Sequence, residues 1–203
     1  MKNKSLLIKN GSVVSSNGIS KLDIFVSNGK IVEIGPSLTT PCDETIDASG
    51  KHIFPGIIDP QVHFRDPGLT HKEDLETGSM SAAAGGVTTF FEMPNTNPST
   101  ITMEKLAEKN NMARSKSVVN YSFFLGATNN NLDEIKKLDS NCGLKIFMGS
   151  STGDLLVDND DDLANIFSCC DKIIAVHAED EELLKKADKL VKKDNFANHP
   201  DAR

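Results

Sequence analysis

The chain has 203 residues, of which 38% are hydrophobic and 25% are charged, and this ordinary globular composition supplies enough apolar mass for a core. Its net charge of −7, from 22 basic and 29 acidic residues, disfavours a general nucleic-acid binder, which would need a positive surface. A small anionic partner stays possible, because one well-placed arginine can hold it.

The N-terminus and the cysteines together predict a cytoplasmic protein with no membrane partner. The apolar run at Ser5–Ile8 is too short for a signal peptide or a membrane span. The spacing of Cys42, Cys142, Cys169 and Cys170 fits neither a zinc knuckle nor a dense disulfide framework. The simplest interpretation is that the four cysteines are free thiols of a protein in a reducing compartment.

The first fifty residues show the pattern of short β-strands. Apolar, β-branched runs alternate with Asn10–Gly11 and Asn28–Gly29, and each of these dipeptides is a strong hairpin signal. We therefore expect a small antiparallel sheet in this part of the chain.

After Pro55–Gly56 the pattern changes to strand, loop and helix. Near-continuous apolar strands between helical stretches indicate a parallel sheet covered by helices. The expected strands cover 56–64, 87–93, 118–125, 143–148 and 172–177. Two architectures fit, an open doubly wound sheet or part of a (β/α)₈ barrel, and the length allows five of the eight barrel units.

Polar residues gather where these strands end, which is where functional groups lie in both architectures. They are His63, Arg65, Asn95, Lys145 and His177. Taken singly, each has an ordinary structural explanation, such as a turn for Asn95 or a loop cap for Arg65. A lysine inside an apolar strand is rarer, because burying an ammonium is costly. Two imidazoles at one rim, together with an oxygen donor, would suit zinc.

In sequence, these strand ends resemble class I dihydroorotases of the amidohydrolase superfamily. The matching segments are Asp59–Gly68, His71–Asp74, Ala82–Thr89, Met93–Pro98, Lys145–Gly153 and His177–Asp180. The resemblance covers essentially the whole chain but only the N-terminal part of the family's barrel. It implies an α/β fold with a small β-sandwich portion over 1–54. The first five βα units of a TIM-type (β/α)₈ barrel would follow over 55–203.

The resemblance also implies a zinc centre and an anion-binding site. By matching position, His63, Lys145 and His177 are metal ligands, with Lys145 carboxylated so that a carbamate replaces the buried ammonium. Arg65 and Asn95 match the positions that bind the substrate's carboxylate. The catalytic aspartate of strand eight is expected beyond this chain.

The implied activity is the reversible interconversion of dihydroorotate and N-carbamoyl-L-aspartate in pyrimidine biosynthesis, by a zinc-activated hydroxide. One departure is that Gln61 stands where the family has its leading metal-binding histidine. Two alternatives therefore stay open. One is a truncated fragment or a non-catalytic scaffold for a partner such as aspartate transcarbamoylase. The other is a hydantoinase- or allantoinase-like hydrolase, for which we expect an apolar group in place of Arg65. We expect a homo-oligomer or a need for a complementing C-terminal segment.

Overall fold

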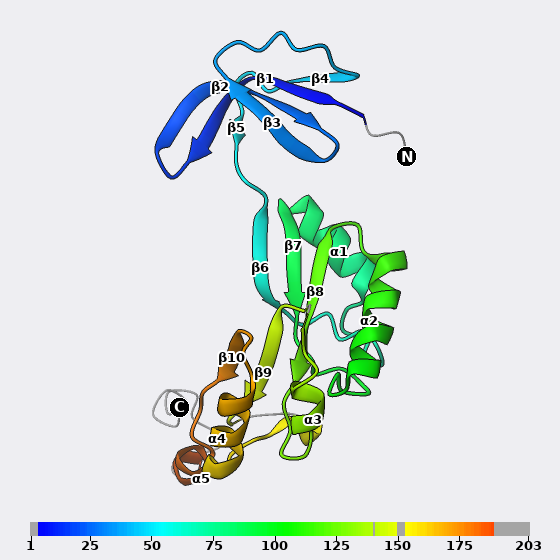
Figure 1. Cartoon of the computed structure of the whole chain (residues 1–203), viewed down its shortest axis with the longest axis vertical. Helices are drawn as coiled ribbons and strands as arrows, with labels where there is room; N and C mark the ends of the chain where they lie inside the picture. The colour runs from blue at the N-terminus through cyan, green and yellow to red at the C-terminus, as the bar shows by residue number, and fades with distance from the viewer. Residues whose placement is uncertain (1–3, 140, 150–152, 189–203) are drawn as a thin grey trace, which may run out of the picture. The chain divides into compact units, whose positions relative to one another are not determined.

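A computed structural model describes residues 4–139, 141–149 and 153–188. The chain divides into two compact units, Met1–Gly56 and Ile57–Arg203 (Figure 1). Among the helices of the described residues, none has the length and apolar character needed to cross a lipid bilayer.

The N-terminal unit is one five-stranded sheet in which β1 is central. Its order is β3-β2-β1-β4, and β5 also pairs with β1. The strands are β1 (Leu6–Ser15), β2 (Gly18–Ser27), β3 (Lys30–Gly35), β4 (Glu44–Asp47) and β5 (His52–Ile53). Strands β1, β2 and β3 are antiparallel as predicted, but β4 and β5 run parallel to β1, so the expectation of a wholly antiparallel sheet is wrong.

The hairpin predicted at Asn10–Gly11 is also wrong, because these residues form a bulge inside β1. Asn10 has a φ of 64°, and the pairing of β1 with β2 shifts register between Ile8 and Gly11. The Asp23 carboxylate accepts the backbone N–H of Asn10 at 2.8 Å and so satisfies the donor that the bulge frees. The chain turns instead between Ser15 and Gly18, whereas the predicted turn at Asn28–Gly29 is confirmed.

The second unit is built on five parallel strands in chain order, β10-β9-β8-β7-β6. They are β6 (Ile57–Val62), β7 (Val87–Glu92), β8 (Asn120–Gly126), β9 (Gly143–Phe147) and β10 (Ile174–His177). The five predicted strands are confirmed, and no end differs from its predicted position by more than two residues. Connections run through α1 (Leu75–Ala84), α2 (Met103–Lys116), α3 (Leu132–Ile135), the short 3₁₀ helix η1 (Gly153–Leu155) and α4 (Asp160–Cys169), and α5 (Glu181–Asp188) follows β10.

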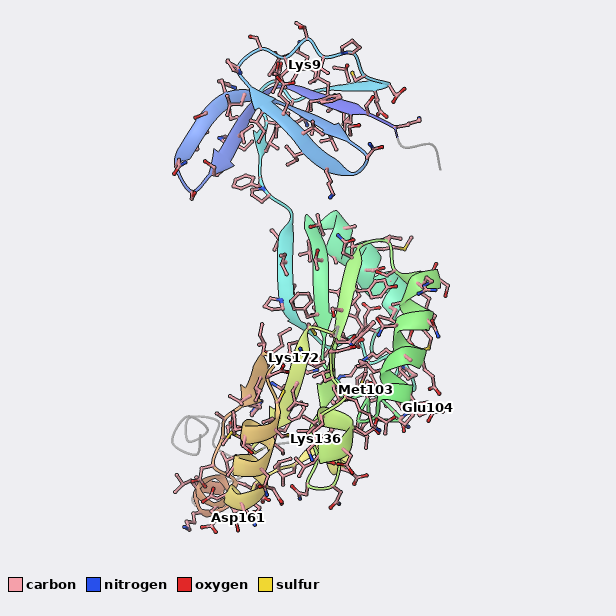
Figure 2. The ribbon with its side chains drawn as sticks, viewed as in Figure 1. Lys9, Met103, Glu104, Lys136, Asp161 and Lys172 are labelled. Atoms are coloured by element: carbon pink, nitrogen blue, oxygen red, sulfur yellow. The ribbon has the colours of Figure 1, made fainter. Side chains whose placement is uncertain are left out.

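The core of this unit lies between the strands and their helices. Phe90, Phe123 and Leu125 of the sheet pack with Leu75 of α1 and Leu106 of α2, and all five are fully buried. Helices α1, α2 and α4 start at side-chain caps, such as the Asp74 carboxylate that accepts the N–H of Thr77 at 2.8 Å. The first turn of α2, labelled at Met103 and Glu104 in Figure 2, is joined to α3 because Met103 N–H donates to Glu134 Oε2 at 2.7 Å.

Candidate functional site

The five residues predicted for the site lie at or near the carboxyl ends of the parallel strands. His63 and Arg65 follow β6, Asn95 follows β7, Lys145 lies in β9 and His177 ends β10. Because parallel strands end at one edge of their sheet, the fold directs these residues to the same edge.

Three of the five are in direct contact. His63 Nδ1 lies 2.8 Å from Asn95 Oδ1, and because an amide oxygen only accepts, the imidazole carries its proton on Nδ1. Arg65 Nη1 donates to the backbone carbonyl of Asn95 at 3.1 Å. This arrangement places a guanidinium, an amide and an imidazole side by side, and the amide nitrogen of Asn95 adds a donor to the same group.

Lys145 and His177 meet at the ring of Phe147. The Lys145 ammonium lies 4.9 Å from the centre of that ring, and the His177 imidazole stacks on it at 6.1 Å between centroids. Lys145 is only 2% exposed, and burial lowers the pKa of its ammonium. Within the described ranges, it forms no ion pair with a carboxylate. Its charge is therefore poorly compensated, which is rare for a buried lysine.

The positive charge of Lys145 acts on His63, so the pair of Lys145 and His177 is linked electrostatically to the group of His63, Arg65 and Asn95. Burial lowers the pKa of His63 most strongly, the contact with Asn95 opposes this shift, and the positive charges of Arg65 and Lys145 lower the pKa further. The lowered pKa favours the neutral imidazole of His63, with Nδ1–H bonded to Asn95 and the lone pair on Nε2. Metal-binding histidines commonly have this arrangement, in which the second ring nitrogen donates to a fixed oxygen.

The candidate ligands His63, His177 and Lys145 are of types that zinc could bind, the lysine as a carbamate, but they are too few to complete a zinc site. In the part of the chain that the structure describes, no three His, Cys, Asp or Glu side chains gather closely enough to hold a metal ion. The Nε2 of His177 lies 2.7 Å from Glu179 Oε2. Gln61, at the position of the expected leading histidine, is exposed on β6. A centre at His63 and His177 would therefore need Lys145 as a carbamate and further ligands.

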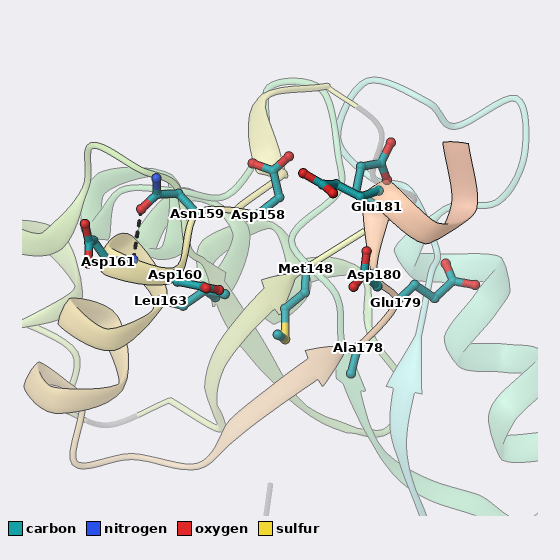
Figure 3. A pocket seen from close by; sticks show the side chains of 11 residues that line it. Met148, Asp158, Asn159, Asp160, Asp161, Leu163, Ala178, Glu179, Asp180 and Glu181 are labelled. Atoms are coloured by element: carbon teal, nitrogen blue, oxygen red, sulfur yellow. Dashed lines mark hydrogen bonds between the residues drawn. The ribbon is translucent and has the colours of Figure 1, made fainter. Parts of the chain in front are cut away.

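Two hollows lie near the carboxyl ends of the strands, and among the described residues that line them Asn95 is the one predicted site residue. A pocket of about 660 Å³ at the ends of β9 and β10 is acidic, and Figure 3 shows Met148 among the carboxylates of Asp158, Asp160 and Asp180. Neither Arg65 nor Asn95 lines it. Asn95 lines a second hollow of about 640 Å³, whose charged residues are the basic Lys105 and the acidic Glu104 and Asp154, fewer acidic residues than in the first. An anion would favour the second hollow over the first.

Two buried charges behind Arg65 were not predicted from the sequence. Glu92 ends β7 and accepts the backbone N–H of Arg65 at 3.0 Å, while Lys109 of α2 lies 2.9 Å from Glu92. The burial of Lys109 could have been inferred from the sequence, because its spacing places it on the same face of α2 as Leu106 and Ala113, which are both buried.

Comparison with known proteins identifies the family. A family model described as "Dihydro-orotase-like" matches residues 50–198. An allantoinase of Desulfitobacterium hafniense is 44% identical over 145 residues, which cover 71% of this chain and 32% of that protein. A dihydroorotase of Methanosarcina mazei is 37% identical over 193 residues, which cover 92% of this chain and 42% of that protein.

The solved structures include a similar fold. The L-hydantoinase (dihydropyrimidinase) of Arthrobacter aurescens matches with a TM-score of 0.89 and 34% identity, over 98% of this chain and 46% of that chain.

The chain therefore belongs to the dihydroorotase-like family, within the amidohydrolase superfamily, as the sequence resemblance predicted. Its fold is the mixed α/β fold of hydantoinase structures. It spans about a third to a half of the length of the relatives it matches, from 32% of the allantoinase to 46% of the hydantoinase chain. The names of these relatives cover three cyclic amide hydrolases and do not single out one of them.

Proposed function

We propose that this chain carries the substrate-binding half of a cyclic amide hydrolase of the dihydroorotase type. The observation that carries the proposal is the contact of Arg65, Asn95 and His63 at one sheet edge. A guanidinium fork and an amide donor suit a planar carboxylate, and the neighbouring imidazole places that carboxylate close to the proposed metal ligands.

The metal ligands in this proposal are His63, Lys145 and His177. The Nδ1-protonated His63 suits a metal ion, and carboxylation of Lys145 would replace a buried ammonium, which forms no ion pair with a carboxylate of the described residues, with an anion that can bind zinc through oxygen. A bound zinc ion would supply an acidified water as the nucleophile for the ring amide. Gln61 is a neutral and weak donor, so we expect weaker zinc binding at this position than with histidine.

The fold proposal is that the five parallel strands are the first part of a (β/α)₈ barrel. Strand order follows chain order, every pairing is parallel, and a helix follows each strand, as in that architecture. The remaining length of the relatives would supply the other strands, further ligands and the proton-transferring aspartate.

A second candidate is a hydantoinase- or allantoinase-type hydrolase. The identity of 44% to an allantoinase and the TM-score of 0.89 to an L-hydantoinase favour it. Arg65 argues against an uncharged ring, because a guanidinium without an anionic partner gains little in a half-buried site.

A panel of cyclic amides tests the proposal. The chain would be loaded with zinc and bicarbonate, with and without a segment that completes the barrel, and incubated with dihydroorotate, allantoin and hydantoin. Mass spectrometry would detect the addition of one water to each ring. We expect ring opening of dihydroorotate first. Opening of hydantoin or allantoin alone would favour the second candidate, and no opening of any ring in the completed barrel would favour a non-catalytic scaffold.

A further inference from the structure

A fully buried ion pair lies behind Arg65, on the side of the sheet that faces α2. Glu92 is 0% exposed and Lys109 is 1% exposed, and Lys109 Nζ lies 2.9 Å from Glu92 Oε2. Among the described residues it is the one ion pair in which both side chains are completely buried. Two hydrophobic residues of similar volume commonly stabilise a protein as well as such a pair does. Packing alone therefore gives no reason for charges at this position.

The contacts of the pair give a reason. Glu92 Oε1 accepts the backbone N–H of Arg65 at 3.0 Å. Lys109 Nζ donates to the carbonyl of Met93 at 3.1 Å, and Met93 N–H donates to the carbonyl of Val62 at 3.0 Å. The pair thus fastens the ends of β6 and β7 together, and the segments that follow these ends carry His63, Arg65 and Asn95.

Arg65 depends on this acceptor because of its backbone conformation. Its φ is 69°, in the left-handed region that residues with a Cβ seldom adopt. In this conformation the N–H points to Glu92, and the side chain reaches the carbonyl of Asn95 at 3.1 Å. A residue held in an unfavourable backbone region needs surrounding structure that fixes it there.

A second ion pair fastens the same turn to the same helix. Lys116 Nζ lies 2.6 Å from Asp66 Oδ2, and Asp66 also accepts the N–H of Leu75 at 3.3 Å. Lys109 and Lys116 are seven residues apart, so they lie on one face of α2 about two turns from each other. Helix α2 therefore holds the Arg65–Asp66 turn at two points, and of these two the contact through Glu92 is the one that involves the backbone N–H of Arg65. The Arg65 carbonyl accepts the N–H of Leu69 at 3.0 Å within the turn itself.

We propose that Glu92, held by Lys109, is a positioning residue that fixes the Arg65 turn and so sets the preference of the site for a ring that bears a carboxylate. The ligand part of this inference rests on the proposed function, whereas the part about the turn rests on the geometry alone. Neither residue touches the substrate in this proposal.

Two double variants separate the hydrogen bond from the charges. Glu92→Gln with Lys109→Met keeps an amide oxygen that can accept the Arg65 N–H, and Glu92→Leu with Lys109→Met removes that acceptor. Both variants lack the buried charges. Lys136→Met with Asp133→Asn is the control, because it removes an ion pair of 3.6 Å between two exposed residues that line neither hollow described above.

The first readout is hydrogen exchange of the Arg65 amide, measured by NMR on the whole chain. We expect the amide of the unsubstituted protein to exchange at least about a hundredfold more slowly than in an unfolded chain. The Gln variant and the control should stay within about tenfold of that rate, and the Leu variant should exchange about tenfold faster or more. Exchange at the unfolded rate in the unsubstituted protein would overturn the inference without any variant, so the test holds even where a substitution prevents folding. Equal rates in the Gln and Leu variants would also overturn it.

The second readout is calorimetric binding of dihydroorotate and of dihydrouracil, which lacks the carboxylate. We expect the Leu variant to lose about tenfold of the preference for dihydroorotate, and the Gln variant and control to keep it within about threefold. If the Leu and Gln variants keep the same preference, the inference fails and the proposed function stands. If the unsubstituted protein shows no preference, the proposed function fails together with the role of Glu92 in specificity, and the exchange rates still report whether Glu92 holds the turn.

Discussion

Replacing Gly78 by alanine tests how closely α1 packs against the segment that carries the site. A Cβ built at Gly78 would lie 2.8 Å from Cδ1 and Cε1 of Phe64 and 2.9 Å from its Cγ. Phe64 lies between His63 and Arg65 in the chain, and its ring packs edge-on against the fully buried Phe90 at 4.8 Å. The ring therefore has little room to move, and the strain would pass to its neighbours in the site.

Two effects of opposite sign determine how much Gly78→Ala changes the free energy of unfolding. Alanine in place of glycine inside a helix gains about 0.8–1 kcal/mol of intrinsic propensity. Overpacking of a well-packed core costs about 1–3 kcal/mol. The difference is a net loss of about 1 kcal/mol, with a range of about 0–2 kcal/mol. The exposed Ser81 of the same helix is the matched control, because Ser81→Ala should gain up to about 0.5 kcal/mol with no new contact.

Urea unfolding followed by circular dichroism at helix wavelengths would measure both variants, since the chain has no tryptophan for fluorescence. We expect Gly78→Ala to unfold at lower urea than the unsubstituted protein and Ser81→Ala at equal or higher urea. If Gly78→Ala is instead more stable by the full propensity gain, the close approach of α1 to Phe64 is wrong.

Three further predictions concern the core, the N-terminal sheet and the proposed metal site. Leu125→Ala should cost about 2–5 kcal/mol of unfolding free energy in urea, because Leu125 is fully buried between sheet and helices; a loss under 1 kcal/mol would contradict that packing. The backbone N–H groups of Asn10 and Leu38 lower the pKa of Asp23, so the ionised Asp23 contributes its full stabilisation above the ordinary aspartate pKa and loses it as the pH falls through the lowered pKa. Asp23→Asn should therefore make the free energy of unfolding depend less on pH in acid, and an unchanged dependence would exclude this role. Zinc-loaded protein supplied with ¹³C-bicarbonate should show a carbamate carbon signal that Lys145→Met abolishes, and absence of the signal in the unsubstituted protein would refute carboxylation.

The parallel strands could be predicted because their signal is local. Each is a short, largely apolar segment beside a helical stretch, and its position needs no knowledge of distant contacts. The bulge at Asn10–Gly11 could not be predicted in this way. Its donor is satisfied by Asp23, and the side chain of Asn10 donates to Asp47 at 2.9 Å, so residues far along the chain decide a conformation for which the local signal favours a hairpin.

The candidate site shows the same division between local and distant causes. His63, Arg65 and Asn95 stand at strand ends, so the sequence predicts that they share one edge, and the structure brings them into contact. The buried pair of Glu92 and Lys109 depends on how α2 lies on the sheet. An acidic residue at the end of an apolar strand and a lysine on an apolar helix face are visible separately, but their pairing follows only from the packing of the two elements.

The most direct test of the central claim is the ratio of kcat/KM for dihydroorotate and dihydrouracil, measured on the zinc-loaded protein with its barrel completed. The two rings differ only in the carboxylate that Arg65 is proposed to bind. Loss of a charge-assisted contact costs about 2 kcal/mol, so we expect dihydroorotate to be favoured about thirtyfold or more. Arg65→Met should reduce the ratio to about threefold or less. Equal kcat/KM for the two rings, or a ratio that Arg65→Met leaves unchanged, would contradict the assignment of Arg65 and of the dihydroorotase-type substrate.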